Sequence, residues 1–218
     1  MSDVIKDLSE LRLNYQRAEL HEDQIATHPH TQFLNWFNVA LTTNLPEPYA
    51  MSVATASAAG VPHVRTLLLR GATEQGYDFY TNYDSLKGHD LAQNPQAQLL
   101  FYWAGLEQQV RISGRVEKIS LEESTDYYHK RPHDSQIAAH VSTPQSGVIE
   151  SREALQQRFD ATFAQLQHTH PLPKPDFWGG YRLIPDYYEF WQGRPNRLHD
   201  RISYTQQNGQ WIIQRLMP

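Results

Sequence analysis

Apolar residues along the chain follow first a helical and then an alternating pattern. From Thr31 they recur at helical spacing as far as the Leu45-Pro46 break, which predicts an amphipathic helix. The pattern then changes to alternation over residues 51–55 and to an aliphatic, β-branched run over residues 63–69, with Ala59-Gly60 as a turn between them. These two runs predict a β-hairpin.

The middle of the chain predicts further strands around a short helix. A strand over residues 77–81 precedes a helix that Asp84 or Ser85 can cap, and this helix ends at Asn94-Pro95 because the residue before proline disfavours the helical region. Residues 97–104 are nearly all apolar and predict a fully buried strand. Residues 109–119 alternate and predict a second central strand.

Capping signals predict two more helices. Ser120 with Glu123 three residues later fits a capping box, so a helix should run from there toward Pro132 and lead into a loop. Another helix begins near Ser151 and ends by His170-Pro171, with apolar residues at helical spacing on one face: Leu155, Phe159, Phe163 and Leu166.

The C-terminal part predicts strands over residues 187–191, 202–206 and 210–216. The last two are joined through Asn208-Gly209, a strong tight-turn signal. Strands and helices do not alternate regularly, so the expected fold class is mainly β (α+β), a small antiparallel barrel with peripheral helices in a single domain.

Composition describes an ordinary globular protein and narrows its chemistry. The chain has 218 residues and a formal net charge of −5, which argues against nucleic-acid binding through a broad basic face. Without cysteine it has no disulfide and no thiolate nucleophile, so redox chemistry needs a bound cofactor. The first ten residues carry charges and no apolar run, so neither a signal peptide nor a membrane segment is expected there. We therefore expect a cytoplasmic location.

Three clusters combine cations with hydroxyl or amide donors, the groups that recognise phosphate oxygens. In the first, Arg65 and Arg70 bracket an apolar strand and are followed by Tyr80-Thr81 and Lys87. Taken alone, this cluster favours the simpler interpretation of solvated charges at strand ends.

The second cluster spans residues 127–136, where a helix end leads into a loop dense in donors. His129 and His133 are spaced i, i+4, but no third ligand is evident, so no metal site is predicted.

The third cluster runs from Glu189-Phe190-Trp191-Gln192 to Arg197-Leu198-His199-Asp200-Arg201. Trp191 offers a flat apolar surface beside cations, as a planar anionic ligand needs. A core tryptophan next to a surface loop with ion pairs fits equally well.

The third cluster resembles the C-terminal signature of the pyridoxine/pyridoxamine 5′-phosphate oxidases. Other segments resemble motifs of that family in the same order and at the same spacing, over nearly the whole chain: residues 65–70, 79–82, 107–110, 131–136 and 177–180. The resemblance implies an FMN-binding split β-barrel that forms a homodimer, with FMN at the subunit interface. It also implies a lid segment over residues 1–20 and a dimerisation and active-site region over residues 175–218.

Site residues are implied position by position. The resemblance places FMN at Arg65, Thr66, Leu67, Leu68, Leu69, Arg70, Tyr80, Thr81, Lys87, Gln109, Gln145, Ser146, Trp191 and Arg201. It places the substrate phosphate at Arg70, Tyr127, Arg131 and Ser135, the substrate's pyridine ring at the catalytic pair Arg197 and His199, and the lid residues Arg12 and Tyr15 over the bound substrate.

Two positions depart from the family pattern. Arg70 stands where the family usually has lysine, which keeps the charge but presents a planar fork instead of a point charge. Leu86 stands where an arginine normally assists Lys87 at the FMN phosphate, and losing that contact should weaken FMN binding by ~1–3 kcal/mol. The loop over residues 142–146 is also one residue longer than usual.

The implied activity is oxidation of pyridoxamine or pyridoxine 5′-phosphate to pyridoxal 5′-phosphate, part of vitamin B6 biosynthesis and salvage. Hydride passes from C4′ to flavin N5 and O2 is reduced to H2O2, while the protein mainly positions the substrate. One alternative is a non-catalytic carrier of FMN or pyridoxal phosphate, which would not need Arg197 and His199 at the reactive carbon. Another is a flavin-dependent reductase of related fold, which would not need Tyr127, Arg131 and Ser135 around a substrate phosphate.

Overall fold

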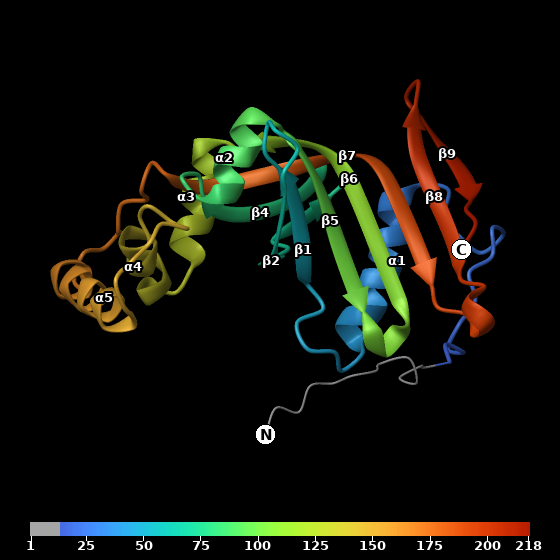
Figure 1. Cartoon of the computed structure of the whole chain (residues 1–218), viewed down its shortest axis with the longest axis horizontal. Helices are drawn as coiled ribbons and strands as arrows, with labels where there is room; N and C mark the ends of the chain where they lie inside the picture. Colours follow the sequence, from blue (N-terminus) through green and yellow to red (C-terminus); the bar gives the residue numbers. More distant parts are fainter. Residues whose placement is uncertain (1–13) are drawn as a thin grey trace. The chain divides into compact units, whose positions relative to one another are not determined.

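The computed structural model describes residues 14–218, whose strands form a nine-stranded sheet accompanied by α-helices (Figure 1). The sheet has the order β2-β1-β5-β6-β7-β4-β3, and β8 pairs with β7 and β9. Its strands are β1 (Ala50–Ala56), β2 (Pro62–Leu68), β3 (Gly71–Thr73), β4 (Gly76–Asn82), β5 (Gln96–Trp103), β6 (Gln108–Lys118), β7 (Trp178–Gln192), β8 (Asp200–Gln207) and β9 (Gln210–Arg215). The α-helices are α1 (Pro29–Thr42), α2 (Leu86–Gln93), α3 (Leu121–Lys130), α4 (His133–Val141) and α5 (Arg152–Leu166).

Internal packing divides the described part into two compact units. Unit 1 comprises residues 14–48, 102–111 and 188–218, and unit 2 comprises residues 49–101 and 112–187. Strands β5, β6 and β7 contribute residues to both. The single domain and its lid and dimerisation regions stay predictions.

In unit 2, antiparallel pairing sets which side chains of β2 share a face. Val53 of β1 pairs with Arg65 of β2, and β1 also pairs with β5. Exposure alternates along β2, so His63, Arg65 and Leu67 lie on its partly buried face while Val64 on the other face is exposed.

In unit 1, aromatic contacts hold helix α1 against the end of β7. Phe33 is fully buried and stacks on Phe37, and Trp36 meets Phe190 edge to face at 5.4 Å. The β8–β9 hairpin turns through Asn208 and Gly209, both at positive φ, as a type I′ turn requires.

Most predicted elements are confirmed within one or two residues at their ends. The hairpin over β1 and β2, the capped helices α2, α3 and α5, and the β8–β9 turn are all present. Ser85, not Asp84, caps α2, and Ser120 and Glu123 form the predicted capping box of α3.

Three predictions are wrong in detail. The donor-rich segment after Pro132 is helix α4 instead of a loop, and β7 is much longer than the five residues expected. Strand β5 is not fully buried, because only alternate side chains reach the core and Tyr102 is exposed.

Within residues 14–218, no helix is long and apolar enough to cross a bilayer.

Candidate active site

A cavity of about 360 Å³ in unit 2 gathers residues from all the predicted phosphate-binding segments of that unit. Its lining comes from β2, β4, α2, α3, the loop after α4 and the start of β7: Thr66, Leu67, Leu68, Arg70, Tyr80, Thr81, Asn82, Lys87, Tyr127, Arg131, Gln145 and Trp178. We call it the main cavity. Three cations line it, Arg70, Lys87 and Arg131.

Lys87 is held at the N-terminus of α2 by hydroxyl groups. Its Nζ donates to Thr81 Oγ1 at 2.9 Å and to the N-cap Ser85 Oγ at 3.0 Å. The helix starts close to the preceding chain because residue 88 is glycine; a Cβ there would lie 1.9 Å from the Tyr83 carbonyl oxygen. Burial, and then the charge of Arg65, lower the pKa of the Lys87 ammonium to about 8. Because burial disfavours the charged form of Lys87, a bound anion beside it would stabilise that form.

Lys87 also lines a second, neighbouring cavity of about 440 Å³, which we call the side cavity. The other residues around it are Pro62, His63, Val64, Arg65, Leu86 and Ser146. Arg65 Nη1 donates to the Val53 carbonyl and to Thr55 Oγ1, both at 2.9 Å, and burial lowers the pKa of its guanidinium. The first sequence cluster is therefore not a set of solvated strand ends; its cations line two cavities joined at Lys87.

Stacked aromatic rings form one wall of the main cavity. Tyr80 stacks on Tyr127 with ring centroids 3.9 Å apart and on Trp178 at 5.6 Å. Arg131 lies over Trp178, with its Cζ 4.7 Å from the ring centroid. This wall holds the Arg131 guanidinium beside the cavity.

Two polar atoms on the cavity wall are buried without a hydrogen-bond partner, Arg131 Nη1 and Gln145 Oε1. A buried donor that is left unpaired costs free energy, so both atoms indicate that a polar ligand completes the site. Burial also lowers the pKa of Arg131. Cations, hydroxyls, an unpaired amide and flat aromatic rings are the groups that a phosphorylated, planar cofactor needs, so the residues present fit FMN.

The predicted ring-binding residues lie together in unit 1. Trp191 and His199 have ring centroids 4.7 Å apart, and Tyr15 meets both edge to face at 5.7 and 5.8 Å. His199 Nδ1 accepts a hydrogen bond from the Arg194 backbone N–H at 3.1 Å, so the neutral imidazole carries its proton on Nε2. Burial, and then the charge of Arg197, lower the pKa of His199. Both observations favour the neutral ring, whose proton on Nε2 is then available to a ligand.

Arg197 sits in a strained turn. Both Asn196 and Arg197 have positive φ values, 56° and 62°, in the left-handed region that side chains disfavour. The Arg197 side chain is exposed. Strain of this kind is typical of functional sites, where it presents a side chain in a fixed direction.

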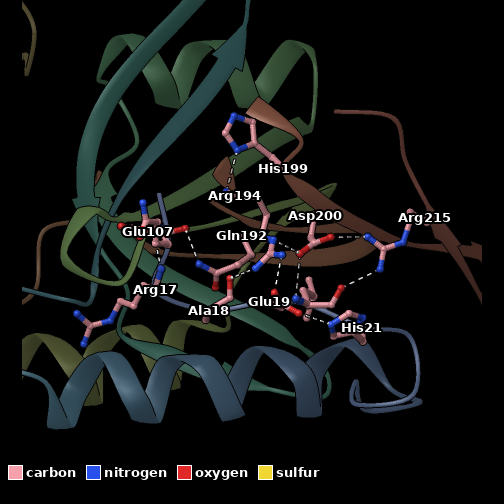
Figure 2. A network of polar contacts seen from close by, with 12 residues as sticks. Arg17, Ala18, Glu19, His21, Glu107, Gln192, Arg194, His199, Asp200 and Arg215 are labelled. Atoms are coloured by element: carbon pink, nitrogen blue, oxygen red, sulfur yellow. Dashed lines mark hydrogen bonds and ion pairs between the residues drawn. The ribbon is translucent and has the colours of Figure 1, made fainter. Parts of the chain in front are cut away.

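Polar contacts tie the segment around Tyr15 to the rest of unit 1 (Figure 2). The Glu107 carboxylate accepts from the backbone N–H groups of Gln16 and Arg17, each at 2.9 Å. Arg194 pairs with Glu19 at 2.5 Å and with Asp200 at 3.5 Å (Figure 2). Tyr15, predicted as part of the lid, thus lies over Trp191 and His199.

The guanidinium of Arg201 is paired with the buried carboxylate of Glu189. Glu189 is 2% exposed and receives two hydrogen bonds from Arg201, at 3.0 and 3.1 Å, and another from Arg111. Although burial alone raises the pKa of Glu189, the two arginines outweigh it and the pKa lies below its usual range.

The structure brings together most predicted residues but in separate groups. The two cavities of unit 2 contain all of the predicted residues of that unit except Leu69, which is buried in the core, and Ser135, which lies on α4 and lines neither cavity. Gln109, Trp191, Arg197, His199 and Arg201 belong to unit 1. Arg12 lies outside the described residues.

Sequence reasoning assigned no role to five residues that line the cavities: Pro62, His63, Val64, Asn82 and Trp178. Trp178 stands in the segment 177–180 and Asn82 in the segment 79–82, both noted above as motifs, so the signal was present for these two. The histidine pair of the second cluster does not converge: His129 Nε2 contacts the Leu172 carbonyl at 3.0 Å, whereas His133 faces the His170 ring. Between residues 14 and 218, no three His, Asp or Glu side chains are placed to hold a metal ion.

Comparison with protein families gives two matches that together cover most of the chain. Residues 38–166 match the model described as pyridoxamine 5′-phosphate oxidase, and residues 178–218 match the pyridoxine 5′-phosphate oxidase C-terminal dimerisation region. A pyridoxine/pyridoxamine 5′-phosphate oxidase of Acinetobacter baumannii is 72% identical over 218 residues, all of both chains. One from Deinococcus deserti is 50% identical over 97% of this chain and 99% of its own.

Solved structures give the same fold. PhzG from Burkholderia lata, in complex with tetrahydrophenazine-1-carboxylic acid, superposes with a TM-score of 0.84 at 30% identity, over 91% of this chain and 98% of that one. A pyridoxamine 5′-phosphate oxidase-related, FMN binding protein from Nostoc punctiforme has a TM-score of 0.70 at 18% identity, over 89% and 100% of the two chains. These likenesses confirm the predicted split β-barrel with peripheral helices.

Proposed function

The chain belongs to the pyridoxamine 5′-phosphate oxidase family, and from this membership we propose that it uses FMN to oxidise pyridoxamine or pyridoxine 5′-phosphate to pyridoxal 5′-phosphate. O2 is the electron acceptor and H2O2 the second product. We further propose a cytoplasmic homodimer with FMN at the subunit interface; the match of residues 178–218 to a dimerisation region supports the dimer.

The observation that carries this proposal is the unpaired cation in the main cavity. Arg131 is held over Trp178 with Nη1 buried and unpartnered, and Arg70 and Tyr127 line the same cavity. A guanidinium fork and a phenol match the oxygens of a phosphate monoester. These groups would anchor the substrate phosphate, so that binding energy at one end of the molecule positions the reactive carbon at the other.

The FMN phosphate would lie at Arg65, Lys87 and Ser146 in the side cavity, and the flavin ring against residues 66–68 in the main cavity. When bound, FMN supplies the two-electron chemistry, accepting hydride from C4′ and passing the electrons to O2. Gln109, Trp191 and Arg201 stay predicted FMN contacts from unit 1, with the Arg201 guanidinium held in place by Glu189.

Arg197 and His199 would act on the substrate ring. His199 holds its proton on Nε2 and would donate a hydrogen bond that orients the ring. The Arg197 cation would lower the pKa of the amine or hydroxyl at C4′ and so favour loss of its proton. Tyr15 would cover the ring and exclude water.

Product analysis under air tests the proposal. The FMN-loaded protein is given pyridoxamine 5′-phosphate, pyridoxine 5′-phosphate or unphosphorylated pyridoxamine, and aldehyde and H2O2 are measured. We expect equal amounts of both products from the two phosphate esters and far slower reaction without the phosphate.

Other results would favour the alternatives. Tight FMN binding without aldehyde would support a carrier. Equal rates with and without the substrate phosphate would contradict the assignment of Tyr127, Arg131 and Ser135 as phosphate-binding residues. Turnover of a ring-reduced aromatic carboxylate, such as the compound bound to PhzG, in place of both esters would indicate a different oxidase.

A further inference from the structure

The side cavity contains a histidine, His63, that has no part in the proposed function. His63 lies on the same face of β2 as Arg65, two residues along the strand, and both line this cavity together with Lys87 and Ser146. The His63 side chain is 27% exposed, so it reaches the cavity without being solvated on all sides.

A buried carboxylate fixes the direction of the His63 ring. Nδ1 of His63 lies 2.9 Å from Asp90 Oδ2, and Asp90, on α2, is 3% exposed. An ionised carboxylate can only accept, so His63 donates from Nδ1 and Nε2 is left for the cavity side. No hydrogen bond from Nε2 to another residue of the described part is present.

Asp90 also connects His63 to Arg65. Thr55 Oγ1 donates to the same Asp90 oxygen at 2.6 Å and accepts from Arg65 Nη1 at 2.9 Å. Burial alone raises the pKa of Asp90, but hydrogen bonds from Thr55 and His63 outweigh it and the pKa lies below the usual range. The carboxylate is thus ionised, and it accepts a hydrogen bond from Nδ1 of His63.

The side cavity lacks a cation at position 86. Leu86, which stands where the family pattern has an arginine, is 44% exposed and provides no charge. A doubly protonated imidazole donates from both nitrogens, so in that form His63 can bond Asp90 from Nδ1 and an anion in the side cavity from Nε2.

We propose that His63, oriented by Asp90, binds the phosphate of the flavin cofactor directly through Nε2. The inference rests on the proposed function, in that the side cavity receives the FMN phosphate. His63 then supplies a hydrogen-bond donor next to Lys87, in a chain whose residue 86 is apolar. A merely structural pair, which only fastens β2 to α2, would not distinguish FMN from riboflavin.

The test compares the affinities of FMN and riboflavin, which differ only in the phosphate. Dissociation constants are measured by quenching of flavin fluorescence for wild type, His63→Gln and His89→Gln. His89 is an exposed histidine next to Asp90 on the same helix, so His89→Gln is the matched control. Thermal melting of the flavin-free proteins checks folding independently.

We expect His63→Gln to weaken FMN binding by about 10-fold, as for loss of one charge-assisted hydrogen bond, while riboflavin binding changes less than about twofold. His89→Gln should leave both affinities unchanged. Equal weakening of both flavins in His63→Gln, or no change in either, would overturn the proposal, as would a wild type that binds FMN no better than riboflavin.

The readout is binding, so it separates this inference from the proposed function. A protein that binds FMN through His63 but forms no aldehyde would retain the inference and lose the oxidase assignment. A protein that forms aldehyde but whose FMN affinity is unaffected by His63→Gln would retain the oxidase assignment and lose the inference.

Discussion

Replacing Arg131 by methionine should weaken recognition of the substrate phosphate while leaving the fold intact. Methionine keeps an unbranched apolar stem beside Trp178 and removes the guanidinium, whose Nη1 is buried without a partner. One charge-assisted hydrogen bond contributes about 1.5–3 kcal/mol, which corresponds to a loss of about 10-fold to about 150-fold in kcat/KM for pyridoxamine 5′-phosphate. Burial already disfavours the charged Arg131, so its removal should not lower the stability of the ligand-free protein.

The assay measures kcat/KM for pyridoxamine 5′-phosphate and for unphosphorylated pyridoxamine. Arg131→Met should lose activity on pyridoxamine 5′-phosphate and change little on unphosphorylated pyridoxamine, since only the ester carries the phosphate that Arg131 binds. Lys130→Met removes the adjacent, exposed cation and serves as the control; it should affect neither substrate. The reasoning is refuted if Arg131→Met lowers both values equally, or if Lys130→Met lowers the first as much as Arg131→Met does.

Four further predictions follow from the contacts described above. Lys87→Met should raise the free energy of unfolding of the ligand-free protein at neutral pH by about 1–3 kcal/mol, because burial lowers the pKa of Lys87 to about 8. Above pH 8 Lys87 loses its proton in the folded protein but keeps it in the unfolded chain. The free energy of unfolding of the wild type should therefore rise with pH from about 8 toward the ordinary lysine pKa. Urea titrations over this pH range measure both this rise and the effect of Lys87→Met. Glu189→Gln should cost about 3–5 kcal/mol in a denaturant titration, since it removes the negative charge that faces Arg111 and Arg201. The pKa of Glu189 is lowered in the folded protein, so its stabilising contribution in the wild type should disappear as the pH falls through that pKa. Ser120→Ala should cost about 1 kcal/mol in the same denaturant titration, through loss of the α3 cap. Glu19→Gln should speed amide exchange of residues 16 and 17 by releasing Arg194, and unchanged exchange would show that Glu107 alone holds this segment.

The sequence predicted the strands and caps whose signals are local. The Ser85, Ser120 and Ser151 caps each act within three residues, and Asn208-Gly209 selects its turn without help from the rest of the chain. Such features depend on neighbouring residues only, so the pattern alone contains them.

Other elements depend on distant partners. Strand β7 contains Gly179, Gly180 and Pro185, which argue against a long strand, but a Cβ at Gly179 would lie 2.1 Å from the Tyr83 hydroxyl, so glycine is required there by packing. Helix α4 was missed because its polar first turn was interpreted as a donor-rich loop, although proline is common at a helix start.

The candidate site was predicted mainly through the family resemblance. Chemistry alone favoured solvated ends for Arg65 and Arg70, and only the fold shows that each lines a cavity. The His63–Asp90 pair joins residues 27 positions apart on different elements, so no spacing rule could have found it.

The central claim is that this cavity system holds FMN and delivers pyridoxamine 5′-phosphate to it. An anaerobic titration of the FMN-loaded protein with that substrate, followed at the visible absorbance of the flavin, tests it most directly. The account predicts that the flavin bleaches, that its colour returns with air as pyridoxal 5′-phosphate appears, and that Arg197→Ala bleaches far more slowly. A bound flavin that the substrate never bleaches would contradict it.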